Sequence, residues 1–271
     1  MENLSVYVDD FVTDLKFKNS SAKTIRTYSL ALKYFFDLNV PLNSENLKEF
    51  LLNYSASTRN TYLTAFRSFA NYLIEEKNID CEWIKKVKFA KKPKKVTEGL
   101  TVEQVHDMIN STHNIKYKAI LYLFVNTGLR NEELCNVKIK DVKLDRKYLI
   151  VHGKGNKEDV VNFKSEVADL LERYLYTRPH LTDDDYLFIN RDGNQYDTTH
   201  IRRLVKRLGK NIGLDIHPHQ LRHTFAQALA NDGADIEEIK GTLRHRSVAT
   251  TMIYVGENRE RRRKTYERSP F

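Results

Sequence analysis

Hydrophobic residues recur every three or four positions through much of the first eighty residues, which is the spacing of one buried helix face. Four such stripes are present, over residues 8–15, 25–36, 47–51 and 62–73. Asn43 and Ser44 precede the third stripe, and both are favoured helix caps. The pattern predicts a small N-terminal domain of four helices, over residues 1–84.

The rest of the chain mixes two periodicities. Helical spacing is seen over residues 120–125, 170–175, 201–208 and 218–233, and Thr101 with Gln104 forms a capping-box pattern at a helix start. Two strand-like runs, 147–152 and 159–163, are separated by a turn rich in Gly and Asn, which is typical of a β-hairpin. We therefore expect a mainly α protein with a small β-hairpin or sheet (α+β).

A lysine-rich stretch separates the two patterns. Seven of the eleven residues from 85 to 95 are lysine, and none of the eleven is acidic. Such a run resists compact packing. It predicts a basic linker over residues 85–97, followed by a second domain over residues 98–271.

The overall charge favours a polyanionic partner. The chain carries a formal net charge of +9 and has a pI near 9.3. Its longest apolar run, residues 119–125, is far below the ~20 residues needed to span a bilayer. The first ten residues lack the pattern of a secretory signal. Cys81 and Cys135 are isolated, which fits a reduced, cytoplasmic protein and argues against structural zinc.

Arg130 is the first candidate for site chemistry. It follows Thr-Gly-Leu and opens a predicted helix, where backbone N–H groups favour an anion. Its guanidinium offers a two-pronged fork for phosphate oxygens. Glu133 lies one turn further along, and it could orient an arginine or histidine of the site or simply balance charge.

His219 and Arg222 are three residues apart, so they share one face of the helix that begins at Pro218. Together they could act on one phosphate, although such a pair alone is more often a solvated face. His217, His219 and His223 also suggest a metal site. No carboxylate belongs to that pattern, and we expect no bound metal.

Four stretches give a more specific indication. They are Thr-Gly-Leu-Arg130-Asn-Glu-Glu-Leu, Gly-Lys154-Gly-Asn-Lys, His219-Gln-Leu-Arg222-His-Thr-Phe-Ala, and Leu-Arg-His245 continuing to Tyr254. Together they resemble the tyrosine recombinase (phage integrase and Xer) family over about residues 100–256. The N-terminal helices and the basic linker resemble the core-binding domain of that family less specifically.

The resemblance implies a site-specific DNA recombinase with a 3′-phosphotyrosine intermediate. Arg130 and Arg222 would clamp the scissile phosphate, while His245 would donate a hydrogen bond to it. Lys154 would protonate the leaving 5′ oxygen, and His219 would assist proton transfer from the nucleophile, Tyr254. The chemistry is consistent, because tyrosine near its pKa of ~10 needs a base and positive charge to attack. Neither ATP nor a metal cofactor is required.

The sequence departs from the family in three respects. Arg244 stands before His245 where glycine is usual, and it could alter the turn or contact DNA. Asp159 and Asn162 replace the Arg and Pro often found after the lysine hairpin, so Lys157 is a second candidate for the role of Lys154. The segment after Tyr254 is short, and it could dock on a neighbouring subunit or face DNA.

The expected partner is double-stranded DNA with a short inverted-repeat site, bound by a homodimer on one site and by a homotetramer in the synapse. The protein would act in the cytoplasm, at the nucleoid, in dimer resolution or in integration and excision of a mobile element. A set of basic residues is expected to contact the DNA backbone. They are Lys23, Arg26, Lys33, Arg59, Arg67, Lys91, Lys92, Lys94, Lys95 and Arg244.

Three other functions stay open. A type IB topoisomerase uses similar residues and would relax DNA without strand exchange. A DNA-binding protein that has lost catalysis is disfavoured, because all six candidate catalytic positions are filled. A metal-dependent phosphatase or nuclease is the remotest alternative, and sensitivity to EDTA would favour it.

Overall fold

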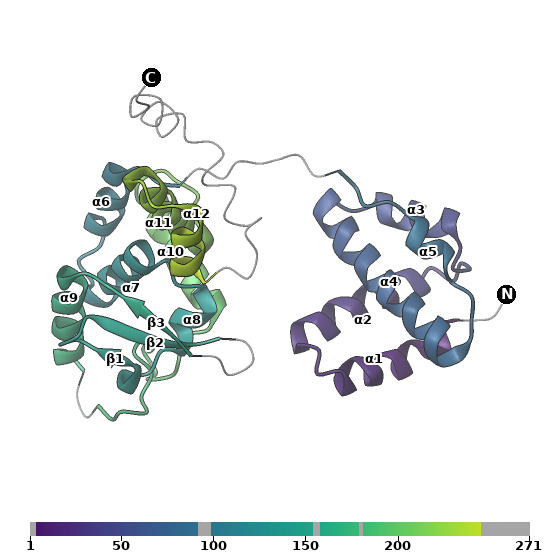
Figure 1. Cartoon of the computed structure of the whole chain (residues 1–271), viewed down its shortest axis with the longest axis horizontal. Helices are drawn as coiled ribbons and strands as arrows, with labels where there is room; N and C mark the ends of the chain where they lie inside the picture. The colour runs from purple at the N-terminus through teal and green to yellow at the C-terminus, as the bar shows by residue number, and fades with distance from the viewer. Residues whose placement is uncertain (1–3, 92–98, 154–157, 179–180, 245–271) are drawn as a thin grey trace, which may run out of the picture. The chain divides into compact units, whose positions relative to one another are not determined.

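The computed structural model describes residues 4–91, 99–153, 158–178 and 181–244, and it divides the chain into two compact units, Met1–Lys95 and Val96–Phe271. Figure 1 shows helices alone in the described part of the first unit, and helices around a small sheet in the second. The expected fold class, mainly α with a small sheet, is confirmed. Within the described ranges, no helix is long and apolar enough to cross a membrane.

The N-terminal unit is built around aromatic rings. Its elements are η1 (Leu4–Tyr7), α1 (Val8–Phe17), α2 (Ala22–Phe36), α3 (Ser44–Leu52), α4 (Ala56–Lys77) and the short α5 (Trp83–Lys86). Asn43 caps α3 as predicted, since its side chain accepts the backbone N–H of Asn46 at 2.9 Å. Phe35 of α2 packs edge-on against Phe50 of α3 and Phe66 of α4, with ring centroids 5.4 and 5.3 Å apart. Edge-on packing of this kind stabilises a core beyond the area that it buries.

The start of the lysine-rich stretch is part of this unit. Val87 is buried in the same core. The side-chain amide of Asn60 donates to the carbonyl of Ala90 at 3.0 Å and accepts its N–H at 2.8 Å. Arg67 donates to the carbonyl of Val87 at 2.7 Å. The linker expected from residue 85 therefore begins later, because α4 supplies polar partners for the backbone of these residues.

The C-terminal unit surrounds one buried helix. Its elements are α6 (Val102–Asn110), α7 (Ile115–Thr127), α8 (Asn131–Asn136), η2 (Ile139–Asp141), β1 (Val142–Lys143), β2 (Tyr148–His152), β3 (Glu158–Asn162), α9 (Ser165–Tyr176), α10 (Thr198–Lys210), α11 (Pro218–Asp232) and α12 (Ile236–Leu243). Ala119, Ile120, Leu121, Leu123 and Phe124 of α7 are all buried, and the helix packs against α9 and α11. The central position of α7 explains why its sequence is apolar on nearly every face.

The sheet contains the predicted hairpin and one further strand. Its order is β1-β2-β3, and both pairings are antiparallel. Leu149 pairs with Val161 and His152 with Glu158, so the register follows the expected hairpin. The two-residue strand β1 was not predicted, because its run is too short to show alternation.

Helix α12 packs on α11 through a small hydrophobic cluster that is separate from the main core. Ala226 and Ala230 of α11 pack against Ile239 and Leu243 of α12, and all four residues are buried. Small residues on α11 let the two helices approach closely. This contact holds the C-terminal end of α12 close to the residues that the sequence places in the site.

Candidate active site

Arg130 lies at a sharp junction between two helices. Helix α7 ends at Gly128, whose φ of +58° is left-handed, and Arg130 is the N-cap of α8. A Cβ at position 128 would lie 2.6 Å from Cδ1 of Phe225 and 2.8 Å from Cδ2 of Leu243. Glycine is needed here for both its backbone conformation and its lack of a side chain. The junction leaves the Arg130 side chain 43% exposed, within reach of a ligand.

Glu133 holds Arg130 from one turn further along α8. Its carboxylate accepts the backbone N–H of Arg130 at 2.8 Å and a guanidinium N–H of Arg130 at 2.5 Å. It also accepts Nη2 of Arg244 at 2.8 Å, although Glu133 is only 8% exposed. Burial alone would raise its pKa, but the charge of Arg244 and the hydrogen bonds and charge of Arg130 outweigh burial and lower it. Glu133 is therefore an anion held between two cations.

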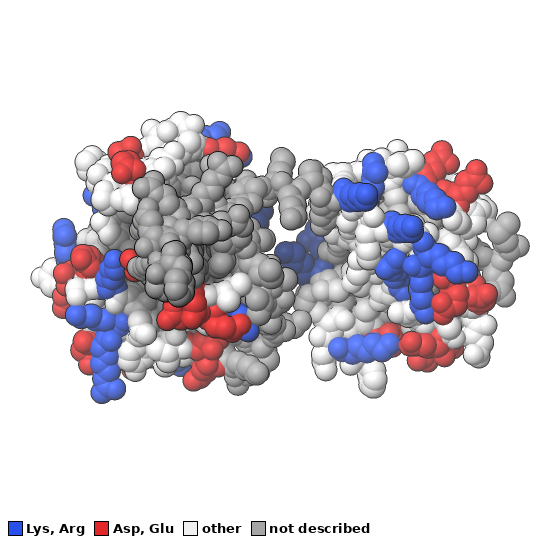
Figure 2. All heavy atoms as spheres, turned by 45° about the horizontal axis from the view of Figure 1, so that its top comes forward, with Lys and Arg blue, Asp and Glu red and all other residues white. Residues whose placement is uncertain are grey.

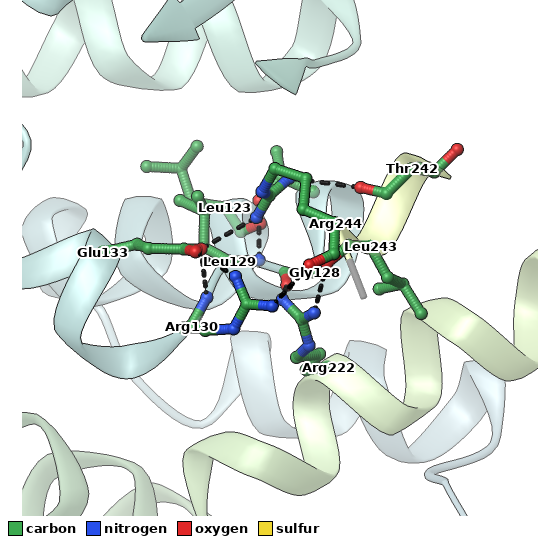
Figure 3. A network of polar contacts seen from close by, with 10 residues as sticks. Leu123, Gly128, Leu129, Arg130, Glu133, Arg222, Thr242, Leu243 and Arg244 are labelled. Carbon is green, nitrogen blue, oxygen red and sulfur yellow. Dashed lines mark hydrogen bonds and ion pairs between the residues drawn. The ribbon is translucent and has the colours of Figure 1, made fainter. Parts of the chain in front are cut away.

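Arg222, on α11, points toward the same junction between α7 and α8. The side chain is 2% exposed, and its two Nη atoms donate to the carbonyls of Gly128 and Leu243. Nη2 of Arg130 donates to the next carbonyl along the chain, that of Arg244, at 2.7 Å. The two arginines thus hold successive carbonyls at the end of α12, as Figure 3 shows.

Two histidines of α11 lie beside these charges, His219 exposed and His223 half-buried. Burial lowers the pKa of His219, and the charges of Arg222, His217 and Arg130 lower it further. His223, whose ring centroid is 4.7 Å from that of His219, has a pKa lowered to about 4, chiefly by burial and then by His219. Both rings are therefore neutral near pH 7, so His219 can accept a proton.

The third histidine, His217, has a structural task. It is the N-cap of α11, where its Nδ1 accepts the backbone N–H of Gln220 at 3.3 Å. The side chain of Gln220 accepts the backbone N–H of His217 at 3.1 Å in return. Across the described residues, no group of three His, Cys, Asp or Glu side chains is arranged to hold a metal ion.

The expected proton donor belongs to the β2–β3 hairpin. His152 closes that hairpin with its Nε2 3.3 Å from Oδ1 of the buried Asp141 and its Nδ1 3.5 Å from Oε1 of Glu158. Lys154 and Lys157 lie outside the described residues. So do His245, which directly follows the carbonyls held by the two arginines, and Tyr254.

The residues expected to contact DNA have different surroundings. Lys23, Arg26, Lys33 and Lys91 are exposed, and Figure 2 shows Lys and Arg side chains gathered on the face of the N-terminal unit in view. Arg59 donates to the carbonyls of Tyr54 and Leu52, and Arg67 to those of Lys85 and Val87. Lys92, Lys94 and Lys95 lie outside the described residues. Arg244 differs most from its expected place, because its guanidinium turns inward onto Glu133 and is only 8% exposed.

One basic surface was missed at the level of sequence. Helix α10 buries Ile201, Leu204, Val205 and Leu208 and exposes five cations on its other face. They are Arg202, Arg203, Lys206, Arg207 and Lys210. Their spacing, in pairs between apolar pairs, is visible in the sequence and would have indicated a basic helix face.

A hollow with a mixed polar and apolar lining is separate from these groups. It has a volume of about 1010 Å³ and is lined by α6, α7 and α11, including Ile109, Tyr122 and Ala228. None of the described candidate catalytic residues lines it. The candidate site is instead a set of charged groups at a helix junction, as suits a phosphodiester in a large polymer.

Comparison with known proteins agrees with this arrangement. The sequence model of the phage integrase family matches residues 98–261. Tyrosine recombinase XerA of Pyrococcus horikoshii is 34% identical over 91% of this chain and 87% of its own length. The crystal structure of the XerH site-specific recombinase bound to palindromic difH substrate, a post-cleavage complex, superimposes with a TM-score of 0.71 and 25% identity, covering 93% of this chain and 81% of that one.

A more distant structure has the same fold. A lambda integrase dimer bound to a COC′ core site superimposes with a TM-score of 0.75 at 17% identity, covering 91% of this chain and 96% of the other. The family model and the XerA relative cover most of the C-terminal unit and most of the whole chain, respectively. The chain belongs to the phage integrase family.

Proposed function

We propose that this protein is a site-specific DNA recombinase that cleaves and rejoins strands through a 3′-phosphotyrosine at Tyr254. The observation that carries the proposal is the convergence of Arg130 and Arg222, from α8 and α11, on successive carbonyls just before His245. Two cations gathered at one point suit a phosphodiester, whose two free oxygens share one negative charge. The names of the relatives, which are tyrosine recombinases, support the same reaction.

The two arginines would supply most of the electrostatic stabilisation. In the transition state, negative charge builds up on the phosphoryl oxygens, and fixed cations stabilise it without reorganising. Arg222 is almost fully buried, so water screens its charge little. Arg130 is held by Glu133 and still presents an exposed edge. We assign both to the phosphate.

The proton transfers would be divided between two groups. Neutral His219 accepts the proton of the Tyr254 hydroxyl as its oxygen attacks phosphorus. Lys154, from the hairpin closed by His152, gives a proton to the departing 5′ oxygen, and His245 donates a hydrogen bond to the phosphate. The phosphotyrosine conserves the bond energy, so a 5′-hydroxyl of another strand can reverse the step and complete exchange.

The DNA would meet basic surfaces on both units. We propose that Lys23, Arg26 and Lys33 of the N-terminal unit and the basic face of α10 contact phosphates. The substrate is double-stranded DNA with a short inverted repeat, bound by a dimer and assembled into a tetramer across two sites. Action on chromosomal or mobile-element DNA places the protein in the cytoplasm, at the nucleoid.

A trapped-cleavage assay tests this function. The full chain is mixed with a library of nicked duplexes in EDTA and without ATP, stopped with SDS, and compared with Tyr254→Phe. We expect a covalent adduct at a 3′ end that the variant does not form. An adduct that persists in Tyr254→Phe would show that Tyr254 is not the nucleophile. In a parallel assay on supercoiled DNA, relaxation without strand exchange would indicate a topoisomerase.

A further inference from the structure

Arg244 occupies a position that suits glycine better than arginine. It is the C-cap of α12 with a φ of +55°. Residues other than Gly, Asn and Asp rarely adopt this left-handed backbone conformation. Backbone strain of this kind persists where surrounding contacts hold the residue in place, and it gathers at functional sites. The contacts of the side chain should therefore show what the arginine does.

Those contacts form a closed ring with Arg130 and Glu133. Nη2 of Arg244 donates to Oε2 of Glu133 at 2.8 Å, and Oε1 of Glu133 accepts Nη1 of Arg130 at 2.5 Å. Nη2 of Arg130 returns to the carbonyl of Arg244 at 2.7 Å. Figure 3 shows the three side chains facing one another. Residue 244 thus provides an acceptor for Arg130 with its backbone carbonyl and a cation for Glu133 with its guanidinium.

The ring also changes the charge that a phosphate would meet. Arg130 with Glu133 alone is a neutral pair, because one carboxylate balances one guanidinium. Arg244 adds a second positive charge at the same carboxylate, so the three groups together carry a net charge of +1. Since Glu133 and Arg244 are buried and Arg130 is half exposed, that excess charge is presented to a ligand through Arg130.

We propose that Arg244 is a positioning residue, which fixes Glu133 and offsets its charge so that Arg130 stays oriented and cationic toward a DNA phosphate. The proposal rests on the function proposed above and deepens it. It also replaces the expectation that Arg244 itself contacts DNA, because a guanidinium only 8% exposed and paired with Glu133 is turned away from that task. Residues such as Arg202 of α10 are far better placed for such contacts.

Four variants of the full chain test the ring: Arg244→Gly, Arg244→Lys, Glu133→Gln, and the double variant Arg244→Gly with Glu133→Gln. Glycine fits a φ of +55°, so Arg244→Gly removes the side chain without adding backbone strain. Lysine keeps the charge and loses the fork. Arg173→Ala, on an exposed part of α9, is the matched control for the loss of an arginine.

The first measurement is the single-turnover cleavage rate at saturating DNA. We expect Arg244→Gly to slow cleavage by about 10- to 100-fold, as misplacing a group that binds the transition state does. DNA affinity and its salt dependence should stay as in the control, and Arg244→Lys should recover part of the rate.

The sign of the Glu133→Gln effect is the sharper criterion. In the wild-type background the change should lower the rate, because it leaves the buried Arg244 without its anion. In the Arg244→Gly background it should raise the rate, because the carboxylate no longer neutralises Arg130. Cleavage by Arg244→Gly at the wild-type rate, purely additive effects, or a loss confined to DNA affinity would each overturn the proposal.

A second readout does not depend on DNA cleavage. Inorganic phosphate is titrated into the protein while the side-chain NMR resonances of Arg130 are followed. We expect the wild type to respond, Arg244→Gly to bind several-fold more weakly, and the double variant to recover. If this pattern held but no DNA gave an adduct, the recombinase function would fail and the role of Arg244 would stand. A wild-type Arg130 that did not respond to phosphate would overturn that role.

Discussion

The two units treat charge in opposite ways. In the N-terminal unit the buried core is entirely hydrophobic over the described residues, and Lys and Arg lie on its surface or donate to its own carbonyls. In the C-terminal unit Glu133, Asp141 and Arg222 are all buried. A buried charge loses several kcal/mol of hydration, which its partners repay only with good geometry. The first unit therefore uses its interior for stability, whereas the second gives up some stability to hold charges in place.

Replacing Arg222 should have the largest effect on cleavage, because it removes one of the buried charges that distinguish the C-terminal unit. Arg222→Ala removes a buried cation and leaves the carbonyls of Gly128 and Leu243 without their donor. We expect covalent adduct formation to fall by about 100- to 1000-fold, the range for losing one donor to a developing anion. The measurement is the single-turnover rate, with Arg173→Ala as control. A fall of less than about threefold, far below that range, would remove Arg222 from the phosphate site.

The lowered pKa of His219 predicts the next largest effect, which is on the pH dependence of cleavage. Its pKa is lowered from 6.5, first by burial and then by Arg222, His217 and Arg130. A general base must be neutral, so the cleavage rate should hold as pH falls through 6.5 and decline only at lower pH. His219→Gln should reduce the rate about 100-fold. The check is a rate profile from about pH 8 to about pH 5, and a wild-type midpoint at or above 6.5 would contradict the assignment.

Position 128 tests how closely the helix junction is packed. Gly128→Ala adds left-handed strain and a Cβ only 2.6 Å from Phe225, so the free energy of unfolding should fall by about 2–4 kcal/mol. Gly213 has a φ of +74° and open space where a Cβ would lie, so Gly213→Ala carries the strain alone, about 1–2 kcal/mol. Chemical denaturation of both variants gives the difference. Equal losses would show that packing against Phe225 is unimportant.

Much of the fold could be predicted because its signals are local. The caps at Asn43 and Thr101, and the hairpin of β2 and β3, depend on residues close together in the chain, and the structure confirms them. The pair Arg130 and Arg222 was found by a motif, which records a spatial arrangement that periodicity does not show.

The misses among single side chains have a common cause, because each depends on partners far apart in the chain or on an unusual backbone. Arg67 bonds to carbonyls 18 and 20 residues away, and Asn60 holds Ala90 across 30 residues. No spacing rule indicates such pairs. The inward turn of Arg244 depends on its left-handed φ and on Glu133, 111 residues away. The basic face of α10 differs, since its pattern was present in the sequence.

The smallest expected effect separates surface cations from structural ones within the N-terminal unit. Arg26 is exposed, so Arg26→Ala should weaken DNA binding a few-fold and reduce the salt slope by about 1. Arg67 donates to Lys85 and Val87 and lies 4.3 Å from the ring centre of Phe89, so Arg67→Ala should instead cost about 1–3 kcal/mol of stability.

Binding isotherms at several salt concentrations, together with thermal unfolding of both variants, separate the two effects. If Arg67→Ala lowered the salt slope as much as Arg26→Ala, the arginine would serve DNA and carbonyls at once. Arg67 would then resemble Arg130 of the C-terminal unit, which binds a backbone carbonyl and still presents an exposed edge to phosphate. A change in stability alone would keep the two units distinct, because a guanidinium already committed to its own backbone adds nothing to the DNA surface.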